Sequence, residues 1–162
     1  MGMMLAGCSK EENGNMEENV KRAEQTQHDY FEEPILDFSL TLEQLKARDT
    51  HRLLGDGKWE PGADDPKGAT APWLVRYAYT HQDGVFTVTY YWTDKGGSDI
   101  YAVSIDWSGQ SGISKEAIHQ QMISRYGVPY YNQESGAERY YSATYKLSII
   151  ETATAIKYYP AE

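Results

Sequence analysis

The chain has 162 residues, a formal net charge of −9, and 40% hydrophobic and 13% aromatic residues. This length predicts one folded domain that buries a core of ordinary size, and a single cysteine excludes any disulfide within the chain. The acidic balance argues against nucleic-acid binding, because phosphates are bound by clustered Lys and Arg. No apolar run reaches the roughly 18 residues that predict a membrane-spanning helix.

Near the N-terminus, the residues Leu5-Ala6-Gly7-Cys8 form a short recognisable pattern. This pattern resembles the lipobox of bacterial lipoproteins, in which a signal peptidase cuts before the cysteine and acyl chains such as palmitate are attached to it. The resemblance implies that residues 1–8 are the truncated end of a signal peptide, whose basic and apolar parts lie upstream of Met1. It also implies that Cys8 is lipidated.

Ser9 follows that cysteine. In the same family, this residue implies a location at the outer membrane of a Gram-negative cell, facing the periplasm. The alternative is a chance match in a cytosolic protein whose one cysteine stays reduced.

The segment from Ser9 to Glu33 is strongly polar. Its eight acidic and three basic residues supply five of the nine net negative charges of the chain. Such a segment buries too little apolar surface to offset its chain entropy, so we predict a flexible acidic tether over residues 9–33. A single folded domain is then expected over residues 34–162.

The first elements of this domain are a strand and a helix. Ile35–Leu40 predicts a short strand, and Thr41 with Gln44 three residues later predicts a capping box at a helix start. The helix is expected to end at Gly55, with an apolar face that includes Leu42, Leu45 and Leu53. Residues 55–72 are rich in Gly, Pro and Asp and predict a long loop around Trp59, and loops of that length are often functional.

Three segments of alternating apolar and polar residues follow, separated by turn-forming residues at 81–84 and 94–98. We expect an antiparallel meander of three strands at Trp73–Thr80, Val85–Trp92 and Asp99–Trp107.

A second helix is expected after Ser114, which has the character of an N-cap, with Glu116 favourably placed in the first turn. Gly127 and Pro129 predict its end. After a polar turn at 132–136, strand-like composition covers Arg139–Glu151 and Thr154–Tyr159.

The predicted fold class is therefore α+β, with two helices packed on an antiparallel sheet of about five to six strands. The expected order is helix, three strands, helix, then two or three strands. Because each half consists of a helix followed by a meander, an internal duplication is an alternative to one irregular domain.

The second half carries a longer pattern: Gly112-Ile113-Ser114-Lys115-Glu116, then Ile118, Arg125-Tyr126-Gly127-Val128-Pro129 and Tyr140-Tyr141. It resembles the small outer-membrane assembly lipoproteins of the BamE/SmpA-like group and the β-lactamase-inhibitor-protein type. The resemblance implies non-enzymatic protein recognition through a sheet face or loops, and it assigns no role to single residues.

No constellation typical of catalysis or metal binding is present in the sequence. The histidines lie far apart and lack spacing such as H-E-x-x-H, and the serines of residues 107–112 miss the G-x-S-x-G elbow. We predict no catalytic residue, no metal ligand and no cofactor, and hence no enzyme. The histidines are His28, His51, His81 and His119.

Aromatic content is unusual, with fourteen Tyr, four Trp and three Phe. Tyr packs its ring while its hydroxyl reaches water or a partner, and it is enriched at interfaces. We therefore expect part of a binding surface at Trp59, Tyr79, Tyr90, Tyr91 and Trp92.

Together these features predict a membrane-anchored, periplasm-facing lipoprotein that binds an envelope or secreted protein without catalysis. An inhibitor or immunity protein is the most concrete form of this hypothesis. Two alternatives stay open: an outer-membrane assembly or structural lipoprotein, and a carbohydrate or small-ligand binder.

Overall fold

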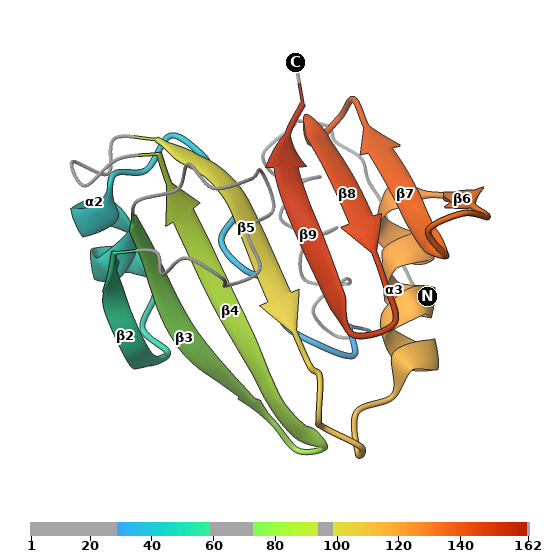
Figure 1. Ribbon diagram of the computed structural model, residues 1–162, viewed down its shortest axis with the longest axis horizontal. Coiled ribbons are helices and arrows are strands. Elements are labelled where there is room, and N and C mark those ends of the chain that lie inside the picture. The colour runs from blue at the N-terminus through green and yellow to red at the C-terminus, as the bar shows by residue number, and fades with distance from the viewer. Residues whose placement is uncertain (1–28, 59–72, 94–98, 162) are drawn as a thin grey trace, which may run out of the picture. The chain divides into compact units, whose positions relative to one another are not determined.

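The computed structural model describes residues 29–58, 73–93 and 99–161 (Figure 1). The chain divides into two units, Met1–Glu32 and Glu33–Glu162, and the second contains every helix and strand of the described residues. Residues 1–8 and residues 9–28 of the predicted tether lie outside the described residues. The helices are α2 (Leu42–Arg48) and α3 (Lys115–Tyr126). The strands are β2 (Arg52–Lys58), β3 (Trp73–His81), β4 (Gly84–Trp92), β5 (Ile100–Asp106), β6 (Tyr130–Asn132), β7 (Ala137–Ser142), β8 (Leu147–Glu151) and β9 (Ala155–Pro160).

All eight strands form one sheet in the order β2-β3-β4-β5-β9-β8-β7-β6, and every neighbouring pair is antiparallel. The predicted α+β class with five to six strands is therefore wrong: the described residues are 45% strand and 17% helix. Three strands account for the difference. β2 lies where the helix end and a loop were predicted, β6 has only three residues, and Arg139–Glu151 is a hairpin of β7 and β8.

The two halves of the unit repeat one arrangement. In each half a helix precedes a meander of four antiparallel strands, and the two meanders join through the pairing of β5 with β9. Each half has four strands, where the sequence predicted three in the first half and two or three in the second. Figure 1 shows both helices behind the same face of the sheet.

The first helix begins as predicted and ends earlier. Thr41 accepts a hydrogen bond from the backbone of Gln44, whose side chain bonds back to the Thr41 backbone, so the capping box is confirmed. The helix ends at Arg48, and Leu53 lies on β2 with 46% of its surface exposed. The strand expected at Ile35–Leu40 does not form.

The predicted meander and the second helix agree with the structure. The three strands of the meander form β3, β4 and β5, and Ser114 caps α3 by accepting from the Ala117 backbone. Gly127 ends α3 with φ 92°, a left-handed conformation that favours glycine.

The helix-covered face of the sheet holds the core. One row of paired residues crosses all eight strands: Leu53, Tyr77, Val88, Ile105, Ile156, Glu151, Glu138 and Tyr131. Its members from Tyr77 to Glu151 are buried. Glu151 is thus a carboxylate in the middle of an apolar row, and such a group must be paired or hydrogen-bonded to be tolerated.

Asp49, the residue after α2, is a second buried carboxylate, with none of its side chain exposed. Its Oδ2 accepts hydrogen bonds from the hydroxyls of Tyr79 at 2.5 Å and Tyr90 at 2.9 Å. His51 places Nδ1 2.8 Å from Oδ1 and stacks its ring on Tyr79 at 3.6 Å. The network joins the end of α2 to β3 and β4, and burial raises the pKa of both tyrosines.

Glu33 is a third buried carboxylate, at the start of the folded unit. It forms an ion pair with Arg125 and accepts hydrogen bonds from the hydroxyls of Tyr158 at 2.7 Å and Tyr126 at 3.0 Å. Burial raises the pKa of Glu33 above its ordinary value of 4.5, against the opposing pull of the Arg125 guanidinium. The residue placed at the end of the tether by sequence is therefore part of the folded unit.

The Asp49 network predicts a large cost for removing one hydroxyl. Tyr90→Phe deletes a donor to Asp49 and an acceptor of the Ile35 backbone N–H at 3.1 Å. We expect the free energy of unfolding to fall by about 1–3 kcal/mol, the cost of leaving buried polar groups unsatisfied. Urea unfolding at pH 7 measures it. Tyr141→Phe is the control, because that side chain is 66% exposed, and a change of less than about 0.5 kcal/mol is expected there. Equal effects of the two substitutions would contradict the role given to the network.

Glu33 predicts a pH dependence of stability. Since its pKa is higher in the folded chain than in the unfolded chain, the folded state binds the proton more tightly. The stabilisation from this group is present below pH 4.5 and is lost as pH rises through the folded-state pKa. Relative to Glu33→Gln, the wild type should therefore lose stability between about pH 4.5 and pH 7, by about 1.4 kcal/mol per unit of pKa elevation.

The measurement is thermal unfolding of both proteins across this pH range. Arg125 stays charged throughout this range, so its attraction for ionised Glu33 is already contained in the folded-state pKa. The slope of the difference is therefore the test. Glu134→Gln, in an exposed turn, should give no such slope. A wild type that gains stability over Glu33→Gln as pH rises would contradict the raised pKa.

Candidate functional site

Four of the five residues predicted to form a binding surface are buried. Tyr79, Tyr90 and Trp92 point to the helix-covered face and are 3%, 0% and 0% exposed, while Tyr91 lies on the other face at 7%. The indole of Trp92 donates to the Leu40 carbonyl at 3.2 Å. These rings are core and network residues, which corrects the expectation of an exposed cluster. Trp59 and Cys8 lie outside the described residues.

Exposed aromatic side chains gather instead in the second half. Among the described residues, seven large hydrophobic side chains are exposed, and five of them lie between positions 128 and 145. The other two, Leu53 and Leu54, are on β2. The five are Val128 (90%), Tyr130 (67%), Tyr131 (54%), Tyr141 (66%) and Tyr145 (49%).

Strand register places two of these rings on the face that neither α2 nor α3 covers. Tyr130 of β6 pairs with Arg139 of β7, and Tyr141 stands two residues further along β7 on the same face. The row continues from Arg139 through Ile150 of β8 to Lys157 of β9. We name this surface the tyrosine face, with the residues Tyr130, Arg139, Tyr141, Ile150 and Lys157.

The tyrosine face carries cations and no acidic residue. Both glutamates of strands β6 to β9, Glu138 and Glu151, point to the helix-covered face. The face therefore differs in charge from the chain as a whole, whose net charge is −9. Sequence composition could not show this, because alternation along β7 and β8 separates charges that are neighbours in the chain.

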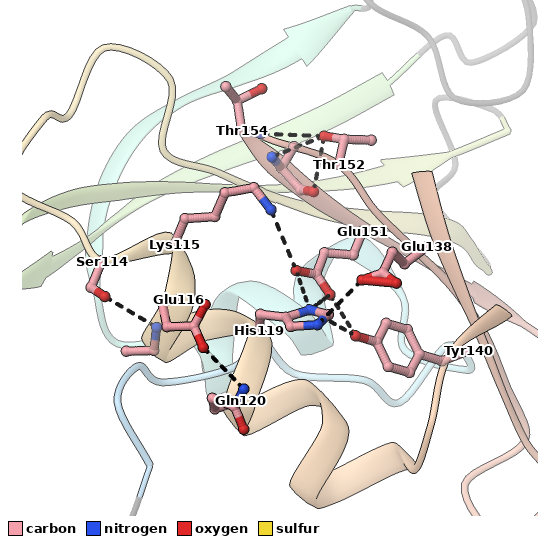
Figure 2. A network of polar contacts seen from close by, with 12 residues as sticks. Ser114, Lys115, Glu116, His119, Gln120, Glu138, Tyr140, Glu151, Thr152 and Thr154 are labelled. Atoms are coloured by element: carbon pink, nitrogen blue, oxygen red, sulfur yellow. Dashed lines mark hydrogen bonds and ion pairs between the residues drawn. The ribbon is translucent and has the colours of Figure 1, made fainter. Parts of the chain in front are cut away.

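On the opposite side of the same strands, a polar cluster forms between α3, β7 and β8 (Figure 2). His119 of α3 has Nδ1 at 3.1 Å from both carboxylate oxygens of Glu151 and Nε2 at 3.3 Å from Glu138 Oε2. The hydroxyl of Tyr140 donates to Glu151 Oε1 at 2.6 Å. Lys115 Nζ lies 3.9 Å from Glu151 Oε2.

Burial is uneven across this cluster. The side chain of Glu151 is 1% exposed, whereas those of His119 and Glu138 are 23% and 26% exposed. Burial, with the Glu151 hydrogen bond and charge, raises the pKa of Tyr140, so this phenol stays a donor at physiological pH. The cluster thus has one closed side, formed by Glu151 and Tyr140, and one side that solvent reaches.

His119, Glu138 and Glu151 also have the geometry to hold a cation: one ligand atom from each lies within 4.8 Å of the others. No short-spacing motif in the sequence indicates this group. Here one histidine meets two glutamates that lie 19 and 32 residues further along the chain, and only the pairing of β7 with β8 brings them together.

Comparison with protein-family models, curated proteins and solved structures gives no match to this chain. In the part of the chain that the structure describes, no helix is both long and apolar enough to cross a membrane.

Proposed function

We propose that this chain is a non-catalytic protein-binding module and that it binds its partner through the tyrosine face. The observation that carries the proposal is the exposure of Tyr130 and Tyr141, at 67% and 66%, on one face of the sheet. Arg139 lies on the same face, paired with Tyr130 and two residues before Tyr141. Tyr and Arg are the residue types that most often dominate the energetics of protein interfaces.

The chemistry of this face indicates the chemistry of the partner. Two large rings and Ile150 offer apolar contact area, and Tyr does so with little loss of conformational entropy. Both glutamates of strands β6 to β9 point to the other face, so the strand side chains on this face carry the cations Arg139 and Lys157. A partner surface that combines apolar side chains with carboxylates fits both features and would be steered by charge.

The most concrete form of the proposal is an inhibitor or immunity protein that covers a secreted or envelope enzyme. Its support is the absence of a catalytic motif from the sequence and the lipobox-like pattern ending at Cys8, which favours a location in the cell envelope. An outer-membrane assembly component would use the same surface on a membrane-protein partner.

Site-specific crosslinking tests the surface. A photoreactive phenylalanine analogue at position 141 should crosslink one partner in envelope preparations, and the same analogue at position 131 should not. Tyr131 is the matched control, since it is similarly exposed and lies on the opposite face of the sheet.

Substitutions then test the energetics on the crosslinked partner. Tyr130→Ala and Arg139→Glu should each weaken binding at least tenfold, about 1.4 kcal/mol, and Tyr131→Ala should change it less than threefold. Isothermal titration calorimetry measures the affinities. Equal losses at positions 130 and 131 would contradict the surface. Saturable quenching of tyrosine fluorescence by glycans, with no protein crosslink, would instead favour a carbohydrate binder.

Membrane attachment through Cys8 is tested separately. Chain purified from its native membranes should carry acyl groups on Cys8, seen by intact mass spectrometry. Cys8→Ser should move the protein from the membrane to the soluble fraction. An unmodified thiol in a cytosolic pool would refute the anchor while leaving the binding surface unaffected.

A further inference from the structure

We propose that His119, Glu138 and Glu151 bind one divalent transition-metal ion of the zinc class. The site lies on the helix-covered side of β7 and β8, opposite the tyrosine face, and the proposal does not rest on the proposed function.

The first argument is the arrangement around the imidazole ring (Figure 2). Carboxylate oxygens stand 3.1 Å from Nδ1 and 3.3 Å from Nε2. A neutral imidazole has one N–H donor and one lone pair. One of the two contacts therefore sets a lone pair against a carboxylate oxygen, unless a cation lies beside it. A second proton or a metal ion meets that requirement.

The charge of the cluster favours the metal ion over the proton. Glu138 and Glu151 both face the ring, and Glu151 is 1% exposed, so a carboxylate there is poorly solvated. Lys115 is 3.9 Å from Glu151, beyond hydrogen-bond distance, and its side chain is 51% exposed. Lys115 is therefore only a weak, solvent-screened partner of Glu151. One added proton leaves the two carboxylates incompletely countered, whereas a divalent ion neutralises both.

The donor set indicates the class of ion. One imidazole nitrogen with two carboxylate oxygens suits zinc and similar transition metals, while Mg²⁺ and Ca²⁺ prefer oxygen ligands alone. Ligand atoms about 2.0–2.2 Å from a zinc ion lie roughly 3–4 Å apart. The ligand atoms here lie within 4.8 Å of one another, so ion binding requires side-chain rotations that bring them closer together.

Tyr140 supplies the support that metal ligands require. Its hydroxyl donates to Glu151 at 2.6 Å and fixes the orientation of that carboxylate, as residues behind metal ligands commonly do. The ligands come from three rigid elements, α3, β7 and β8. The partly exposed His119 and Glu138 give an ion access from solvent.

The test uses the full chain, freed of metal with a chelator and titrated with Zn²⁺ by calorimetry and with Co²⁺ by visible absorption. We expect one ion per chain at this site, d–d bands in the Co²⁺ form, and a higher midpoint of thermal unfolding with Zn²⁺. Glu138→Gln should weaken this binding at least tenfold. Since Lys115 competes with the ion for Glu151, Lys115→Gln should strengthen it.

His51→Gln is the matched control. His51 also contacts a buried carboxylate, Asp49, but does not belong to the His119 group, so its loss should leave Zn²⁺ binding at that group unchanged. Ions held elsewhere in the chain persist in all variants and cancel in the comparison. Circular dichroism confirms that the variants fold.

Two results would overturn the proposal. The first is equal Zn²⁺ affinity and stoichiometry in wild type and Glu138→Gln. The second is a His119 ring whose ¹⁵N signals report a doubly protonated imidazolium that saturating Zn²⁺ does not change, because a proton then holds the position assigned to the metal.

Discussion

The pairing of buried carboxylates with tyrosine hydroxyls holds the helices and the start of the folded unit onto the sheet. Three carboxylates are involved, and each accepts at least one phenol hydrogen bond: Glu33, Asp49 and Glu151. A buried charge without such partners costs several kcal/mol, and removing one partner is far worse than never burying the pair. The core therefore requires Tyr at positions where Phe would fill the same volume. This is a physical reason for fourteen Tyr beside three Phe.

The buried and exposed tyrosines also separate what local sequence predicts from what only the fold decides. Local signals predicted the capping box at Thr41, the meander of β3 to β5 and both ends of α3, because each depends on residues close in the chain. They could not separate the tyrosines that bond inside, such as Tyr90, from those that face outward, such as Tyr141. Both lie in alternating aromatic strands, and only the positions of the helices decide which face is buried. The His119 group was equally hidden, since its ligands meet through strand pairing.

The two halves share one arrangement and differ in the face that neither described helix covers. In the first half, Thr89, Tyr91 and Ser104 on that face are 4%, 7% and 7% exposed. In the second half, Tyr130 and Tyr141 on the corresponding face have 67% and 66% of their surface exposed. A repeated fold thus supplies one closed and one open sheet surface. Among the described residues, the exposed aromatic side chains on this face lie in the second half, where they suit a large partner.

Strand β7 connects the two proposed sites. Its side chains alternate, so Glu138 and Tyr140 point to α3 while Arg139 and Tyr141 point to the tyrosine face. β7 is also next to the edge strand β6, whose three residues give it few ladder bonds of its own. An ion held between Glu138, Glu151 and His119 would fix β7 against both β8 and α3. Because Arg139 and Tyr141 belong to the same backbone segment, that fixation would also reduce the entropy they lose when a partner binds.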